Sequence, residues 1–216
     1  MGEGGAFFEG LRRRMAVENL DPGDRLLELL TPGMIVEHIQ RYKFASGLFP
    51  DGSKILDLAS GRGYGASILS EGNCKVFGLD LGRHYVKKAA KKYGKEAQFG
   101  VADVRKLPIE DESVNGVTAF EITEHLDKDD QPGFIKEIAR VLKPGGRAII
   151  SIPHHYSRGI LRNAHHHYEP TPDELKLMIS DAGLKIEKEA GQVVCSEAEA
   201  AEFRGRLNKP LNRKTL

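Results

Sequence analysis

The chain has 216 residues, of which 40% are hydrophobic and 29% are charged, and its formal net charge is +1. This length and composition indicate one globular domain with short appendages. The small net charge gives no global field toward nucleic acid or an anionic membrane, so neither is expected as a partner. No apolar run is long enough for a membrane span or a secretion signal, and we therefore expect a cytoplasmic location.

The ends of the chain differ in composition from its centre. The first ten residues include four glycines, and we expect residues 1–33 to be an N-terminal extension that is partly disordered. Helical spacing of apolar residues begins at residue 34, and a single domain is predicted over 34–195. Residues 196–216 form a predicted polar tail that is rich in basic residues.

Strand and helix patterns alternate through this domain. Apolar runs predict strands at 54–59, 75–80, 97–102, 114–120 and 147–152. Helical patterns predict helices at 34–48, 64–71, 83–93, 131–142 and 172–182. The alternation predicts an α/β fold, a Rossmann-like doubly wound and mostly parallel sheet with helices on both faces. A sixth strand is expected at 184–189, and only 192–195 remains for a short seventh strand.

A glycine-rich turn follows the first predicted strand. Gly61, Gly63 and Gly65 stand at alternate positions between that strand and the next helix, and Asp57 lies inside the strand. Glycine lets the backbone approach a ligand closely, and the helix N-terminus presents free N–H groups. A nicotinamide dinucleotide site usually has Gly-x-Gly-x-x-Gly, and the third glycine is missing here in that register.

Acidic residues stand at the ends of the next three predicted strands. They are Asp80, Asp103 and Glu121. In an open parallel sheet, ligands bind outside the carboxyl ends of the strands, and an acid at the end of the second strand can hydrogen-bond the ribose hydroxyls. The pattern therefore predicts a ligand that contains a nucleoside.

Together these motifs resemble the class I S-adenosylmethionine-dependent methyltransferases, in particular the small-molecule branch called type 11. The resemblance covers about residues 35–190 and rests on ordered segments at 57–63, 80, 102–108, 120–126 and 141–146. It implies S-adenosyl-L-methionine as cofactor and an enzyme that methylates an oxygen, nitrogen or carbon of a small-molecule acceptor. The alternative is a non-catalytic S-adenosylmethionine-binding module that regulates a partner.

The resemblance also assigns cofactor contacts. Those after the strands are Asp57, Ala59, Gly61, Gly63, Asp80, Leu81, Asp103, Val104 and Glu121. Asp80 would hold the ribose and Asp103 the adenine amino group. The family more often has glycine where Ala59 stands. Arg41 and Tyr42, on the helix ahead of the first strand, would help to enclose the cofactor or the acceptor.

Histidines are the candidates for chemistry on the acceptor. His125 and His154 are the candidate catalytic bases, because a neutral imidazole can take a proton near neutral pH. His155, His166 and Glu169 would face the acceptor, since the last two match a His-x-x-Glu spacing in the resemblance.

Five histidines between residues 154 and 167 also raise the question of a metal. The nearest acid in the sequence is Glu169, and Cys74 and Cys195 lack metal-site spacing, so no metal is expected. The sequence specifies neither the acceptor nor the oligomeric state.

Overall fold

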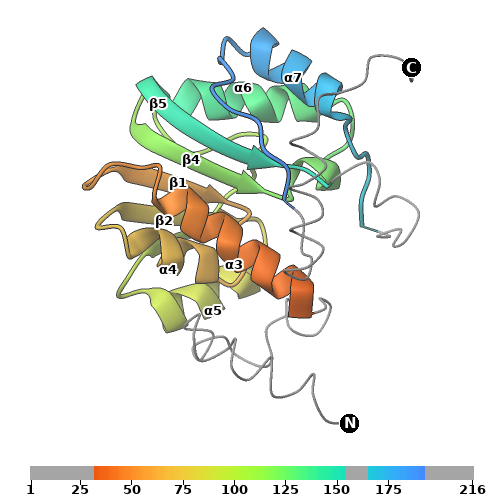
Figure 1. Ribbon diagram of the computed structural model, residues 1–216. Helices are drawn as coiled ribbons and strands as arrows, with labels where there is room; N and C mark the ends of the chain where they lie inside the picture. The colour runs from red at the N-terminus through yellow and green to blue at the C-terminus, as the bar shows by residue number, and fades with distance from the viewer. Residues whose placement is uncertain (1–31, 154–164, 193–216) are drawn as a thin grey trace, which may run out of the picture.

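The computed structural model describes residues 32–153 and 165–192. Its centre is a parallel sheet of five strands in the order β3-β2-β1-β4-β5 (Figure 1). The strands are β1 Lys54–Leu58, β2 Lys75–Asp80, β3 Gln98–Val101, β4 Val114–Phe120 and β5 Leu142–Ser151. This order, with β1 in the middle, is the doubly wound arrangement predicted from the sequence.

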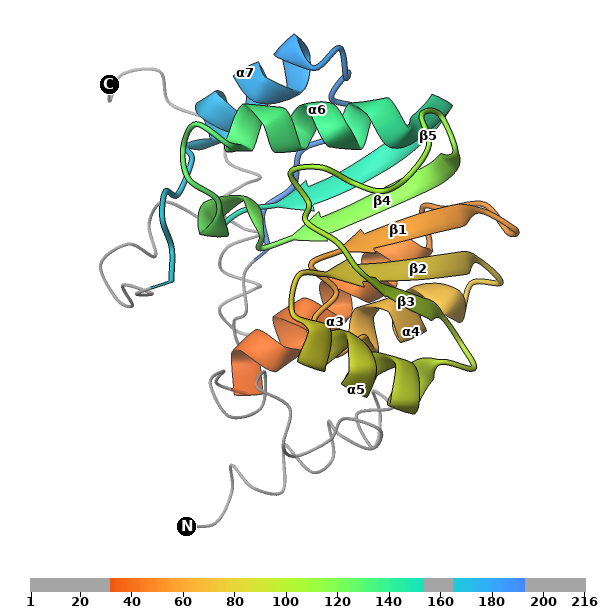
Figure 2. The ribbon, with the colours of Figure 1, turned by 180° about the vertical axis from the view of Figure 1, so that it is seen from behind.

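Helices cover both faces of the sheet, as Figures 1 and 2 show. They are α3 Pro32–Ser46, α4 Tyr64–Ser70, α5 Arg83–Tyr93, α6 Gln131–Val141 and α7 Pro172–Asp181, with a short 3₁₀ helix, η2, at Thr123–His125. The first three lie on one face, and α6, with α7 beside it, lies on the other. Among the described residues, no helix is long and apolar enough to cross a membrane.

A hydrophobic cluster fills each side of the sheet. Leu56 and Leu58 of β1 pack toward Phe134 of α6 in one cluster. In the other, Ile55 of β1 packs with Tyr42 of α3. Neighbouring residues of β1 thus face opposite helical layers, which is why this strand is a nearly continuous apolar run in the sequence.

The N-terminus of α7 has a capping box. Glu174 N–H donates to Thr171 Oγ1 at 3.2 Å, and Thr171 N–H donates back to Glu174 Oε2 at 2.8 Å. Pro172 occupies the first turn, and Gly183 follows the helix with φ of 79°. These interactions satisfy N–H groups that the helix itself leaves without partners.

The predicted sixth strand is wrong. Residues 184–189 form no strand and run past the sheet without pairing with β5. The charged side chains of this stretch instead make ion pairs, Glu187 with Arg147 at 3.1 Å and Glu189 with Lys176 at 2.9 Å. Of the predicted seventh strand, only Gln192 lies within the described residues, and it is not part of a strand.

Strand β5 begins earlier than the predicted residue 147. Leu142 already pairs with Val114, and the register shifts before Gly116 pairs with Arg147. Gly145, with φ of 77°, lies within this irregular stretch. The extra residues of the bulge allow the Pro-Gly-Gly turn to remain inside the strand.

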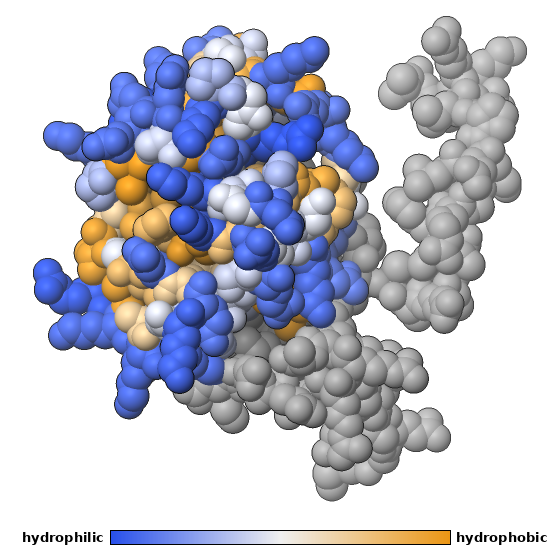
Figure 3. All heavy atoms as spheres, turned by 90° about the vertical axis from the view of Figure 1, so that its left-hand side faces the viewer, coloured by the Kyte–Doolittle hydropathy of each residue, from blue (hydrophilic) through white to orange (hydrophobic). Residues whose placement is uncertain are grey.

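Figure 3 shows the side of the molecule where the strands begin. Hydrophobic and hydrophilic residues are interspersed on this surface. The residues predicted to bind the cofactor lie at the opposite ends of the strands, where β1, β2 and β4 end.

Candidate functional site

The glycine turn leaves bare backbone beside open space. Gly61 has φ of 54°, and a Cβ added there would meet no heavy atom within 4 Å. Gly63 has φ of 86°, and an added Cβ would lie 2.7 Å from the Phe99 ring. Ala59 also has a positive φ, 55°, at the position where the resemblance more often has glycine. The turn is therefore left-handed at three positions, which glycine adopts most easily.

Asp80 links this turn to the end of β2. Its Oδ2 accepts a hydrogen bond from Gly61 N–H at 2.9 Å, and its Oδ1 accepts one from Gly82 N–H at 2.7 Å. The adjacent Leu81 is 67% exposed, an apolar side chain without cover. A half-buried carboxylate and an exposed apolar surface thus lie together at the ends of β1 and β2.

Asp57 is completely buried at the end of β1. Its Oδ1 accepts hydrogen bonds from Tyr42 Oη at 3.0 Å and from Thr118 Oγ1 at 2.9 Å. Its Oδ2 has no hydrogen-bond partner within the described ranges. Burial raises the pKa of the Asp57 carboxyl to about 7, although the two donors oppose the shift.

Helix α3 reaches the site through two adjacent residues. Tyr42 is buried against Gly65, where an added Cβ would lie 2.1 Å from the Tyr42 ring. Arg41 Nη1 pairs with Glu121 Oε1 at 3.0 Å and donates to Ser151 Oγ at 3.1 Å. The structure therefore connects α3 to Asp57 at the end of β1 and to the ends of β4 and β5.

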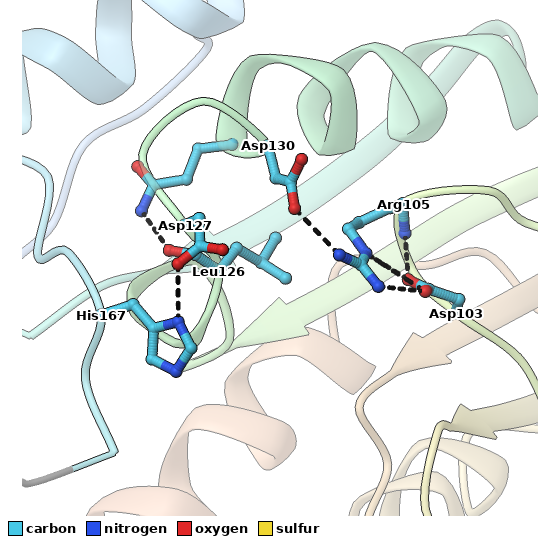
Figure 4. A network of polar contacts seen from close by, with 7 residues as sticks. Asp103, Arg105, Leu126, Asp127, Asp130 and His167 are labelled. Carbon is cyan, nitrogen blue, oxygen red and sulfur yellow. Dashed lines mark hydrogen bonds and ion pairs between the residues drawn. The ribbon is translucent and has the colours of Figure 1, made fainter.

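Asp103 is already engaged by a residue that the sequence analysis did not consider. The Arg105 guanidinium contacts its carboxylate at 2.7 Å and also pairs with Asp130 at 3.0 Å (Figure 4). Hydrogen bonds from Arg105 lower the pKa of the Asp103 carboxyl. The side chain of Val104, between them, is buried. The only signal in the sequence was an opposite charge two positions after Asp103.

Two histidines meet at the end of β4. The rings of His125 and His166 are perpendicular, with centroids 4.9 Å apart. His125 Nδ1 hydrogen-bonds to the His165 carbonyl at 3.0 Å, and His166 Nδ1 to Glu169 Oε1 at 2.7 Å. Burial lowers the pKa of His125. His154 and His155 lie outside the described residues.

Glu124 completes this group, although the sequence analysis gave it no role. It is fully buried, and neither carboxylate oxygen has a hydrogen-bond partner among the residues described. Burial, reinforced by the nearby charge of Glu121, raises the pKa of Glu124 to about 8. Ligand-capable atoms of Glu124, His125 and His166 all lie within 4.8 Å of one another. The signal for Glu124 in the sequence was its position next to the candidate base His125.

Known proteins resemble this chain in both sequence and fold. The family model described as a methyltransferase domain, type 11, matches residues 56–150. A probable S-adenosylmethionine-dependent methyltransferase of Mycolicibacterium smegmatis is 31% identical over 144 residues, which cover 65% of this chain and 55% of the relative. The ubiquinone/menaquinone biosynthesis C-methyltransferase UbiE of Desulfotalea psychrophila is 33% identical over 113 residues, which cover 51% of this chain and 45% of the relative.

The chain thus spans about half the length of these curated relatives. Among solved structures, the YcgJ protein of Bacillus subtilis superimposes with a TM-score of 0.64 at 20% identity, covering 81% of this chain and 80% of that chain. A likeness at that identity supports the fold. The matched domain and the relatives thus make this chain similar to S-adenosylmethionine-dependent methyltransferases, and its doubly wound sheet is the fold of the solved structure.

Proposed function

We propose that this protein transfers a methyl group from S-adenosylmethionine to a small-molecule acceptor. The observation that carries the proposal is the position of Asp80 at the end of β2, beside the open glycine turn. An acid in this position of a doubly wound sheet can hydrogen-bond a ribose.

The residues at this edge fit the cofactor. The open space at Gly61 suits close approach of a ligand to the backbone, and the exposed Leu81 offers an apolar surface for the adenine ring. Asp57 would organise the turn next to the amino-acid end of the cofactor. Asp103 would meet the adenine amino group only through oxygen lone pairs that Arg105 leaves available.

When bound, the cofactor supplies a methyl group on a positively charged sulfur. The protein's part is then to align the acceptor with that methyl group and to exclude water. His125 is suited to accept a proton from an acceptor hydroxyl, because its Nδ1–H donates to the His165 carbonyl and leaves Nε2 with the lone pair. Its lowered pKa keeps the ring neutral at physiological pH.

The acceptor would approach from the side of η2 and residues 165–169. His166 and Glu169 are hydrogen-bonded to each other there, and they would face the acceptor. The relative from Desulfotalea psychrophila is named for quinone biosynthesis, and that name supports a small-molecule acceptor here.

A screen of acceptors tests the proposal directly. The protein is incubated with S-adenosylmethionine and a fractionated metabolite extract, and release of S-adenosylhomocysteine is followed together with the mass of any new product. We expect release that depends on one fraction, with a product heavier by one methylene unit. Cofactor binding without turnover in every fraction would favour the non-catalytic regulatory module.

A further inference from the structure

We propose that Glu124, His125 and His166 bind one divalent transition-metal ion at the carboxyl end of β4. The three side chains come from two segments that are about 40 residues apart in the chain, and their ligand-capable atoms lie within 4.8 Å of one another. The site is distinct from Asp80 and the glycine turn, which would hold the cofactor.

The strongest observation is the condition of Glu124. A buried carboxylate normally has hydrogen bonds or an opposite charge, since removing a charge from water without compensation is costly. Glu124 is fully buried, and both of its oxygens are without a hydrogen-bond partner among the described residues. A bound cation would supply the partner that the surrounding side chains do not provide.

The two imidazoles are oriented as metal ligands usually are. A ligating histidine donates its other ring N–H to a carbonyl or a carboxylate, which fixes the tautomer and the ring orientation. His125 Nδ1 is bonded to the His165 carbonyl at 3.0 Å, and His166 Nδ1 to Glu169 Oε1 at 2.7 Å. With Nδ1 protonated in both rings, Nε2 of each ring carries the lone pair that a metal would use.

The two segments are held together by contacts outside the proposed ligand set. His167 N–H donates to the Glu124 carbonyl at 2.8 Å. The buried Gln131 side chain donates to the carbonyls of Thr123 at 2.9 Å and Tyr168 at 2.8 Å. The ligand geometry is therefore supported by the fold itself, as a preorganised site requires.

The donor set indicates the kind of ion. Two imidazoles and one carboxylate suit Zn²⁺, Fe²⁺ or Mn²⁺, whereas Ca²⁺ and Mg²⁺ prefer sites built from oxygen alone. Three protein ligands leave coordination positions for water or for an oxygen of the acceptor. Coordination of the acceptor rests on the proposed function. A metal on Nε2 of His125 takes the lone pair that the role of base needs, so His125 would then act as a ligand and not as a base.

The sequence by itself indicates no metal, because the acid nearest to the histidine run is Glu169. Glu124 is distant from His166 along the chain, and only the packing of residues 165–169 against η2 brings it near. The proposal thus depends on tertiary structure that spacing alone does not reveal.

The test uses the full chain without a histidine tag. The metal content is measured by mass spectrometry, and Zn²⁺ and Co²⁺ are then titrated into chelator-treated protein by calorimetry and visible absorption. We expect one ion per chain. Removing a residue that only hydrogen-bonds a metal ligand typically weakens metal binding by roughly 10- to 100-fold. Glu124→Gln and His166→Ala each change a proposed ligand, so each should weaken metal binding by at least that much.

His167→Ala is the matched control, because His167 is adjacent but pairs with Asp127 at 2.8 Å (Figure 4). It should bind the metal like the unmodified protein, and thermal melting in chelator checks that each variant is folded. Absence of saturable binding, or equal binding by all three variants, would overturn the proposal. Metal binding is measured without acceptor, so failure of methyl transfer would leave this result standing.

Discussion

Asp57 shows how burial changes the chemistry of one residue at the cofactor edge. Its carboxyl group is inaccessible to solvent and has two hydroxyl donors on one oxygen. Burial raises its pKa from the ordinary 3.8 to about 7. The folded protein therefore binds a proton at this residue under conditions where the unfolded chain has lost it.

Replacing Asp57 with asparagine should change the pH dependence of stability. In the unmodified protein, this group stabilises the folded state fully below pH 4, and the contribution is lost as the pH rises toward 7. Between pH 5 and 6.5 the free energy of unfolding should fall about 1.4 kcal/mol per pH unit more steeply than in Asp57→Asn. Urea unfolding at several pH values measures both slopes, and parallel slopes would show that Asp57 titrates normally.

At the scale of elements, α3 is fixed to the glycine turn by close contact between Tyr42 and Gly65. A methyl group on residue 65 would overlap the tyrosine ring, because its Cβ would lie 2.1 Å from the nearest ring atom. Tyr42 in turn donates to Asp57. This contact couples the position of the helix to the carboxylate at the end of β1.

Gly65→Ala should therefore lower the free energy of unfolding by about 1–3 kcal/mol, as overpacking in a core usually does. Gly133→Ala in α6 is the control, since an added Cβ there meets nothing within 4 Å. Alanine at that helical position should be neutral or stabilise by up to about 1 kcal/mol. Chemical unfolding of both variants checks this, and equal stability would contradict the proposed overlap.

Sequence patterns predict these elements well where strands are buried on both faces. Strands β2 and β4 have the predicted bounds, because apolar runs there end at an acid or a turn. Residues 184–187 alternate apolar and charged side chains, yet 184–189 form no strand. Alternation reports which side chains face the core, whereas a strand also needs an edge with which it can pair, and that depends on the whole sheet.

At the scale of the molecule, topology brings the residues predicted to bind the cofactor to one edge of the sheet. Parallel strands end together, so Asp57, Asp80 and Glu121 follow from chain order alone. The pairing of Arg105 with Asp130 and the proximity of Glu124 to His166 depend on how loops fold back. Those contacts join side chains whose proximity no periodicity encodes, and the sequence analysis therefore missed them.

In the function that we propose, the edge formed by β1 and β2 holds S-adenosylmethionine through Asp80. Isothermal titration calorimetry of Asp80→Ala tests this, with Glu96→Ala as the control, because Glu96 is an exposed acid in the turn before β3. Loss of charge-assisted hydrogen bonds of about 1.5–3 kcal/mol should weaken cofactor binding by about 10- to 160-fold in Asp80→Ala. Glu96→Ala should bind as the unmodified protein does. Unchanged affinity in a folded Asp80→Ala variant would contradict the account.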